Sequence, residues 1–321
     1  MLGALKLVRI SALPSALADV FGGSALALAA IPWFSSTQFA REKLPWLLLT
    51  TVGIYLGGMG LNDVLHRHKD AAMHKPRPIV TGAISVEAAT LLTSALYALG
   101  LLGAVIAGCG PQALVLALGT LIYNLLALGK VERGVAKLSM GPALIGVAVL
   151  GACRAIHVSL PLWALAGDQG WHLLDSAPHL LQAYAGVLVY FSLLTAVSLY
   201  EDRGGGAKAL WTMQLGLLPA IFKLPLWALM QGERAHWLLE DLLPMAILAT
   251  LYLWLARAFN AARKEPTPRN LGRCVGLGIR GECLVMAAFA LAVLPQEPMW
   301  GTAAILCFPA AALMSKWVSP T

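Results

Sequence analysis

Residues 45–70 read PWLLLTTVGIYLGGMGLNDVLHRHKD, an apolar run that ends in a dense group of polar and charged side chains. A second apolar run, at 178–200, ends in the same way, because residues 198–206 read SLYEDRGGG. A helix of about 20 apolar residues spans the hydrocarbon core of a bilayer, and both runs reach that length. Charged groups are costly at the edge of a membrane, so these two polar clusters are the main indication of a functional site.

The rest of the chain has the same membrane character. Of its 321 residues, 59% are hydrophobic and 12% are charged, whereas a soluble domain carries about 25% charged residues. Because backbone groups in lipid need internal partners and the pattern does not alternate, the apolar segments are predicted to be helices. We therefore expect an all-α polytopic membrane protein with nine to ten transmembrane helices in one bundle. The ten segments are 13–34, 45–65, 84–107, 112–129, 138–161, 178–200, 210–230, 242–260, 272–294 and 299–316.

No soluble domain is expected, because every connection between the apolar segments is short. The sequence thus predicts one integral-membrane domain over 1–321, with 299–316 as an additional helix. The five cysteines include no CxxC pair, so neither a disulfide framework nor a thiolate metal site is indicated.

The distribution of Lys and Arg predicts which side of the membrane each loop occupies. Sixteen of them precede the first segment or fall after the even-numbered segments, whereas three, Arg41, Lys43 and Arg234, fall in the other loops. The positive-inside rule then places the N-terminus and both polar clusters in the cytoplasm. For a bacterial source, the membrane would be the inner membrane of the cell. The net charge of +7 is accounted for by these loops, so no nucleic-acid partner is expected.

The polar residues of the first cluster share one face of a helix. At about 100° per residue, Asn62, Asp63, His66 and Asp70 fall within an arc of about 100° if the helix continues to Asp70. Carboxylates that converge at a surface repel one another unless a cation lies between them. Oxygen-rich sites of this kind suit Mg²⁺, which often bridges to phosphate oxygens.

The second cluster reaches the same side of the membrane, because four crossings separate it from the first. Ser198 and Asp202 are neighbours at helical spacing, and Glu201 lies beside them. Basic residues of the nearby loops suit contacts with phosphate groups. The two clusters together predict a diphosphate held by Mg²⁺ and basic side chains, and the alternative is that these loops are simply charged and solvated. The basic residues are Lys75, Arg77, Lys130, Arg133 and Lys208.

Two stretches match a known pair of motifs. Residues 62–85 read NDVLHRHKDAAMHKPRPIVTGAIS, close to the pattern NDxxDxxxD followed by RPxxxGxIS, and residues 198–208 occupy the place of a DxxxD motif with a following Gly and Lys. They resemble the motifs of the UbiA superfamily of intramembrane prenyltransferases. The similarity runs in order over roughly residues 9–295 and looks closest to the EboC type. Weaker matches are 19–23, 123–130 and 153–157. In the last of these ranges the family commonly has Arg-x-x-Asn.

The resemblance implies a nine-helix bundle that transfers a prenyl group from a polyprenyl diphosphate to an acceptor within the membrane, with Mg²⁺ as cofactor. Such an enzyme is a transferase of alkyl groups other than methyl, in isoprenoid biosynthesis. The chain departs from the family at His66 and Ser198, which replace motif aspartates, and at His157, where Asn is common. Two candidate carboxylate ligands are therefore missing, and imidazole suits Zn²⁺ better than Mg²⁺.

The predicted site combines both clusters with the resemblance. The predicted metal ligands are Asn62, Asp63, Asp70 and Asp202. The predicted diphosphate contacts are Lys75, Arg77, Lys130, Arg133, Arg154 and Lys208. The predicted catalytic residues are Asp63, Asp70, Glu201 and Asp202, with Glu201 as auxiliary acid or base. The expected partners are a polyprenyl diphosphate, an unidentified acceptor and the lipid bilayer.

Several alternatives stay open at this point. The missing carboxylates favour a non-catalytic UbiA-like membrane component that binds, or helps to export, an isoprenoid-linked metabolite. A head-group transferase acting on a CDP-alcohol would need a DGxxAR…GxxxDxxxD block, which the sequence lacks. For Arg154 the alternative is an ion pair with Asp19. His66 and its neighbours His68 and His74 are interpreted as solvated loop residues, and Glu282 is given no role.

Overall fold

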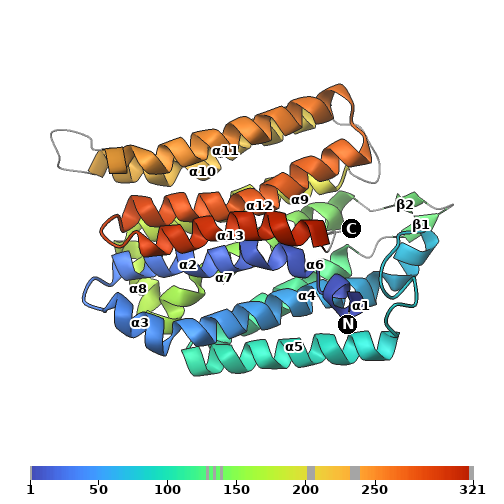
Figure 1. Cartoon of the computed structure of the whole chain (residues 1–321), viewed down its shortest axis with the longest axis horizontal. Coiled ribbons are helices and arrows are strands. Elements are labelled where there is room, and N and C mark those ends of the chain that lie inside the picture. Colours follow the sequence, from blue (N-terminus) through green and yellow to red (C-terminus); the bar gives the residue numbers. More distant parts are fainter. Residues whose placement is uncertain are drawn as a thin grey trace.

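The computed structural model of the chain describes residues 2–127, 130–132, 135–137, 140–200, 207–231 and 239–317. Long helices dominate it (Figure 1). The helices are α1 (Leu2–Leu7), η1 (Ile10–Ala12), α2 (Leu13–Ala30), α3 (Ser36–Glu42), α4 (Leu44–Ala72), α5 (Val86–Ala107), α6 (Gly110–Leu126), α7 (Met140–Ala166), η2 (Gly167–Gln169), α8 (Gly170–Ser176), α9 (Pro178–Ser198), α10 (Ala207–Gln231), α11 (Leu239–Lys264), α12 (Pro268–Val293) and α13 (Met299–Trp317). The strands β1 (Lys130–Glu132) and β2 (Val135–Lys137) form a short antiparallel pair.

In the described ranges, nine helical stretches are at least 18 residues long and apolar enough to cross a membrane, and α6 is a shorter apolar helix. The predicted all-α polytopic bundle is thereby confirmed, and the chain is an integral membrane protein. The strand pair β1–β2 is the one sheet in the part of the chain that the structure describes. The assignment of the whole chain to a single domain stays a prediction.

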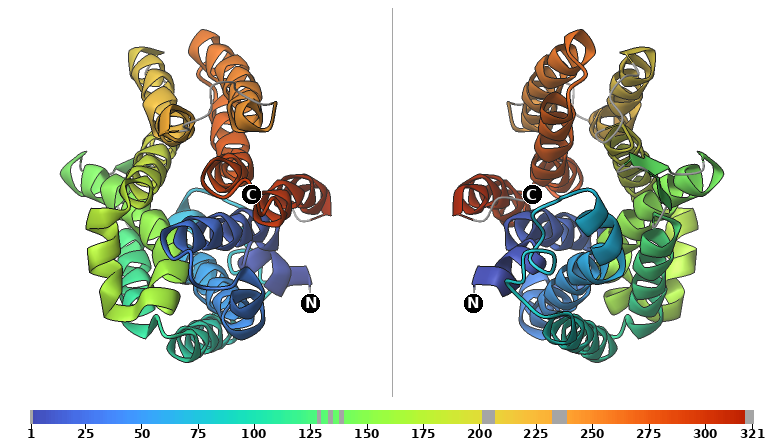
Figure 2. Two further views of the ribbon diagram at one scale, coloured as in Figure 1. Left: turned by 90° about the vertical axis from the view of Figure 1, so that its left-hand side faces the viewer. Right: turned by 90° about the vertical axis from the view of Figure 1, so that its right-hand side faces the viewer.

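The long helices run alongside one another, with α2 in the middle of the bundle (Figures 1 and 2). α2 packs against α4, α7, α12 and α13. The main hydrophobic core is formed by α9, α10, α11 and α12, with α2 and α7 contributing at its side. The α10–α11 hairpin stands at one edge, against α9 and α12, and α5 lies at the opposite edge (Figure 2).

Helix α4, which carries the first polar cluster, is fixed by close packing against α5. A Cβ atom on Gly53 would lie 2.4 Å from the backbone nitrogen of Gly100, so glycine is needed there for the two backbones to approach. Ser85 caps the start of α5, because its hydroxyl oxygen accepts a 3.2 Å hydrogen bond from the Ala88 amide. Gly108 caps the other end and adopts a left-handed conformation with φ 95°.

The two ends of the bundle carry different connections. The N-terminus, the β1–β2 pair and the C-terminal end of α13 lie at one end, and α3 and α8 lie at the other (Figure 1). The first of these ends includes the loops that the Lys and Arg distribution predicts to be cytoplasmic.

We predict that an impermeant maleimide will not label cysteines placed at positions 72 and 206 in intact cells, but will label both after permeabilisation. A cysteine at position 168, exposed in η2 at the opposite end, should react from outside. Background is low because the five native cysteines are buried, and burial raises the pKa of the Cys109 thiol, between α5 and α6, to about 12. Labelling at 72 or 206 without permeabilisation would overturn the orientation.

Candidate functional site

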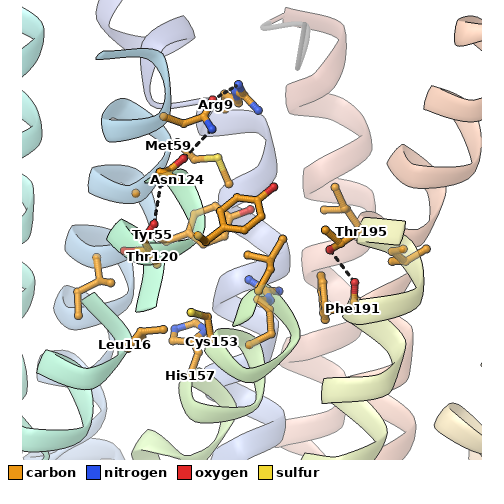
Figure 3. Close-up of a pocket in the computed structure, with 18 of the residues that line it drawn as sticks. Arg9, Tyr55, Met59, Leu116, Thr120, Asn124, Cys153, His157, Phe191 and Thr195 are labelled. Atoms are coloured by element: carbon orange, nitrogen blue, oxygen red, sulfur yellow. Dashed lines mark hydrogen bonds between the residues drawn. The ribbon is translucent and has the colours of Figure 1, made fainter. Parts of the chain in front are cut away.

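A cavity of about 320 Å³ lies between α4, α6, α7, α9 and α12. Most of its wall is apolar, and polar groups gather at its two ends. Figure 3 shows Arg9 and Asn124 toward one end and Cys153 and His157 toward the other. The lining residues are Arg9, Ile54, Tyr55, Gly58, Met59, Asn62, Leu116, Thr120, Tyr123, Asn124, Leu150, Cys153, Arg154, His157, Phe191, Leu194, Thr195, Ser198, Val275 and Ile279.

Arg9 connects the N-terminal segment to the first polar cluster. Its Nη2 atom lies 3.2 Å from Asp63 Oδ1 and donates to Asn62 Oδ1 at 3.3 Å. The Asp63 side chain is 1% exposed, so this ion pair is well shielded from water on the carboxylate side. Arg9 adopts a left-handed backbone conformation, with φ 46° and ψ 53°. Such a conformation is costly for a residue with a side chain and persists where the surroundings hold it, often at functional sites.

A chain of hydrogen bonds extends from Asn62 across the cavity end to α6. The Asn62 Nδ2 group donates to Asn124 Oδ1 at 2.7 Å, and Asn124 Nδ2 donates to the Thr120 carbonyl oxygen at 2.8 Å. The His66 Nε2 atom lies 3.0 Å from the Asn124 carbonyl oxygen, so it carries the proton and donates. His66 is 5% exposed. Its interpretation as a solvated loop residue is therefore wrong, because α4 continues through Ala72 and buries this face.

Asp70, the second carboxylate of the first cluster, also lies beside an arginine. Arg77 Nε is 3.8 Å from Asp70 Oδ2, and both side chains are largely buried. The backbone between them is folded back, since the Lys75 amide donates to the Asp70 carbonyl oxygen at 2.9 Å. The structure thus brings Asn62, Asp63 and Asp70 to one end of α4, and each carboxylate has a guanidinium nearby.

The second cluster is described only in part. Ser198 ends α9 and lines the cavity, and Lys208 is exposed in the first turn of α10. Glu201, Asp202 and Arg133 lie outside the described residues, and for Lys130 only the backbone, in β1, is described. The convergence of Asp202 with Asp63 and Asp70 around one site therefore stays a prediction.

A second polar group closes the cavity at the end away from Arg9. Arg154 Nη2 lies 3.1 Å from Asp19 Oδ2 and also contacts Glu282 Oε2. His157 Nδ1 lies 2.7 Å from Asp19 Oδ2, and its Nε2 lies 2.9 Å from Thr51 Oγ1. Four helices meet here, because Asp19 comes from α2, Thr51 from α4, Arg154 and His157 from α7, and Glu282 from α12. We call Asp19, Arg154, His157 and Glu282 the floor cluster.

The floor cluster is deep within the bundle. Arg154 and Glu282 each lie 14 residues beyond the first residue of their helices, which is about 21 Å of helix. All four side chains are at most 7% exposed. The ion pair between Arg154 and Asp19, left open as an alternative by the sequence, is present, and Glu282 adds a second carboxylate. The predicted contact between Arg154 and a diphosphate stays a prediction.

Sequence reasoning gave no role in this site to two charged residues that take part in it. Glu282 is a carboxylate inside an apolar segment, and that position was itself a signal of a buried partner. Arg9 was counted only for orientation. Nothing near it in the sequence marks it, because it lies 53 residues from Asn62 and reaches it through a left-handed turn.

The described residues do not fit Mg²⁺ at the first cluster. Among them, no group of three His, Cys, Asp or Glu side chains is arranged to hold a metal ion. Asp63 and Asp70 each lie beside an arginine, and His66 donates its proton to a backbone oxygen. Mg²⁺ prefers several oxygen ligands in octahedral geometry, which this set does not supply.

Comparison with solved structures identifies the architecture. A UbiA homologue from Aeropyrum pernix K1 aligns over 88% of this chain and 97% of its own, with 16% identity and a TM-score of 0.59. The chain has the UbiA fold. A structure of digeranylgeranylglyceryl phosphate synthase aligns over 91% of this chain and 98% of its own, with 16% identity and a TM-score of 0.56. The resemblance carried by residues 62–85 and 198–208 is therefore confirmed at the level of the fold.

The remaining comparisons do not change this assignment of the fold. A UbiA homologue from Archaeoglobus fulgidus, bound to DMAPP and Mg²⁺, aligns over 88% of this chain and 99% of its own, with 18% identity and a TM-score of 0.47. No family model matches the sequence, and no curated protein matches it either.

We predict that Arg154→Met will lower the free energy of unfolding by about 3–5 kcal/mol, because it leaves two buried carboxylates without their cation. The triple variant Arg154→Met, Asp19→Asn, Glu282→Gln removes all three charges and should recover part of that loss. The measurement is denaturation of the purified protein in mixed micelles, followed by tryptophan fluorescence. Arg41→Gln, whose ion pair with Glu42 is exposed, is the control and should change nothing measurable. Equal stability of the single and triple variants would contradict the assignment.

Proposed function

We propose that this chain transfers a prenyl group from a polyprenyl diphosphate to an acceptor that enters the central cavity from the membrane. The observation that carries the proposal is the cavity itself, which has apolar walls and a cationic end inside a UbiA fold. The shared fold with digeranylgeranylglyceryl phosphate synthase supports it.

The two ends of the substrate would bind to different parts of the cavity. The isoprenoid tail is apolar and would lie along the apolar wall, where burial of its surface favours binding. The diphosphate would lie at the end marked by Arg9. Arg9 and residues 62–77 together contain five cationic side chains and two carboxylates, those of Asp63 and Asp70. Their net charge is therefore +3. The cations are Arg9, Arg67, Lys69, Lys75 and Arg77.

The reaction needs charge stabilisation more than acid–base chemistry. The bond between C1 of the prenyl group and the diphosphate oxygen breaks, and its electron pair leaves with the diphosphate. Guanidinium and ammonium groups fixed around the diphosphate stabilise the charge that develops there. The nucleophilic atom of the prenyl acceptor then bonds to C1 and loses a proton. We propose Glu201 as the base that takes this proton. The apolar wall keeps water away from the allylic cation, which water would otherwise capture.

Magnesium stays a prediction for this chain. Two of its predicted ligands, Asn62 and Asp63, are hydrogen-bonded to Arg9. A third, Asp70, lies beside Arg77. The fourth, Asp202, is outside the described residues. We therefore assign no step of the reaction to a metal ion. The proposed diphosphate contacts are Lys75, Arg77, Lys130, Arg133 and Lys208, with Arg9 added. Arg154 is not among them, because it is paired with Asp19 and Glu282 at the other end of the cavity.

The alternative is a non-catalytic membrane component that binds an isoprenoid-linked metabolite. It is favoured by the replacement of two motif aspartates by His66 and Ser198. A turnover assay separates the two proposals. The purified protein is incubated in nanodiscs with radiolabelled geranylgeranyl diphosphate and a membrane lipid extract as the source of acceptor. Formation of a labelled product with release of diphosphate supports transfer. Binding of the prenyl diphosphate with no product and no diphosphate release favours the alternative.

We predict that Gly58→Leu will weaken binding of a prenyl thiodiphosphate at least tenfold, because its side chain would fill part of the cavity. Gly58→Ala is the matched control, since a Cβ atom at Gly58 meets its nearest neighbour, Tyr97 Oη, at an ordinary 3.5 Å. Inorganic diphosphate has no tail and should bind both variants equally. Equal binding of the prenyl compound to the two variants would place the tail elsewhere.

A further inference from the structure

We propose that Arg9 takes the place of a metal ion at the first polar cluster, so that a prenyl diphosphate binds there through guanidinium groups without a divalent cation. This inference rests on the proposed function and changes its chemistry. Three observations support it: the oxygen atoms that Arg9 contacts, the N–H groups that it keeps available for a ligand, and the contacts that fix its position.

Arg9 occupies the oxygens that a metal would need. Its Nη2 atom contacts both Asn62 Oδ1 and Asp63 Oδ1, and these two residues are predicted metal ligands. The remaining oxygen of Asp63, Oδ2, is buried and has no hydrogen-bond partner among the described residues. A single buried oxygen is too few ligands for Mg²⁺, which keeps several oxygens around it. Within the described residues, a metal ion held by Asn62 and Asp63 would therefore have to displace Arg9.

Arg9 still has donors to offer to a phosphate. Both of its contacts use Nη2, so the Nη1 group takes part in neither of them. The Nε atom is buried and is not counted among the donors that a ligand can reach. The side chain lines the cavity and is 22% exposed, so a ligand in the cavity can reach it. A guanidinium binds phosphate oxygens with parallel hydrogen bonds and keeps its charge at any physiological pH.

The rest of the first cluster points the same way. At the place of the middle motif aspartate, His66 presents a proton to a carbonyl oxygen and so adds no negative charge. Asp70, the other carboxylate, lies beside Arg77. Each carboxylate of this cluster thus has its countercharge from the chain. A diphosphate brought to this end meets net positive charge before any metal binds.

The position of Arg9 is fixed before a ligand arrives. The left-handed turn at Arg9 holds one side of the ion pair, and the hydrogen bond from Asn62 to Asn124 holds the helix that carries the other. Little order would then have to be created on binding, which favours affinity. A mobile surface arginine would lose much of its contribution to the entropy of ordering its side chain.

The first test measures binding of radiolabelled geranylgeranyl thiodiphosphate to the purified full-length chain, in EDTA and across a Mg²⁺ titration. Wild type should bind in EDTA with an affinity within about threefold of that in Mg²⁺. Arg9→Gln should lose at least tenfold in EDTA, about 1.4 kcal/mol, and Arg9→Lys should fall between them. Arg263→Gln is the matched control, because Arg263 is also half-buried and donates to a side-chain amide oxygen, that of Gln214 at 2.7 Å. It should bind as wild type does.

The second test counts bound Mn²⁺ by electron paramagnetic resonance, without any substrate. Arg9→Gln should bind Mn²⁺ more tightly than wild type, since Asp63 then lacks its countercharge. The double variant Arg9→Gln, Asp63→Asn should lose that gain. Thermal unfolding of each variant checks that it is folded.

The outcomes separate this inference from the proposed function. If wild type binds the prenyl thiodiphosphate only with Mg²⁺, and Arg9→Gln behaves identically, the inference is wrong and the proposed function stands. If wild type binds it neither in EDTA nor in Mg²⁺, the proposed function fails, and the inference fails with it. An unchanged Mn²⁺ affinity in Arg9→Gln would also overturn the inference.

Discussion

A charge placed among apolar helices has to be matched by an opposite charge from another helix, and the bundle is organised by that constraint. Arg154 meets it with Asp19 and Glu282, and in doing so joins α7 to α2 and α12 at about the same depth. The attraction within such a group is offset largely by the loss of hydration, so its net contribution to stability is small. Its effect on which helix packing is adopted is larger, because sliding or rotating any of these helices would separate the charges.

The same constraint acts at the other end of the cavity, with a different result. There the carboxylate of Asp63 is buried, whereas its partner Arg9 is partly open to the cavity. The pair is neutral as a whole, yet its exposed side is cationic. An anion in the cavity therefore meets a donor whose position is set by a buried carboxylate behind it, and this is how a site can be preorganised without a bound ion.

The sequence was sufficient for the fold and for one half of the candidate site. Long apolar runs and their punctuation gave the helices, and residues 62–85 were enough to indicate the UbiA fold, since α4 continues through Asp70 as the shared face of that cluster required. The partners of those residues were not predictable in the same way. Asn124 and Arg9 contact Asn62 from 62 and 53 residues away in the sequence. The Asn124 contact depends on how α4 and α6 pack, and the Arg9 contact depends on a left-handed turn. No local sequence pattern encodes either feature. The apolar segment around Glu282 did contain a signal, because a carboxylate there needs a buried cation.

The floor cluster also bears on permeation. A carrier that moves its cargo across the bilayer has to open a path alternately to each side, and here such a path would run between α2, α7 and α12. Opening it would separate Arg154 from two carboxylates in a medium of low dielectric constant, at a cost of about 3–5 kcal/mol for a broken pair. The floor cluster thus opposes any opening of the bundle between these three helices. The isoprenoid chain of the substrate proposed above is soluble in lipid, so it would not need a path past the floor cluster.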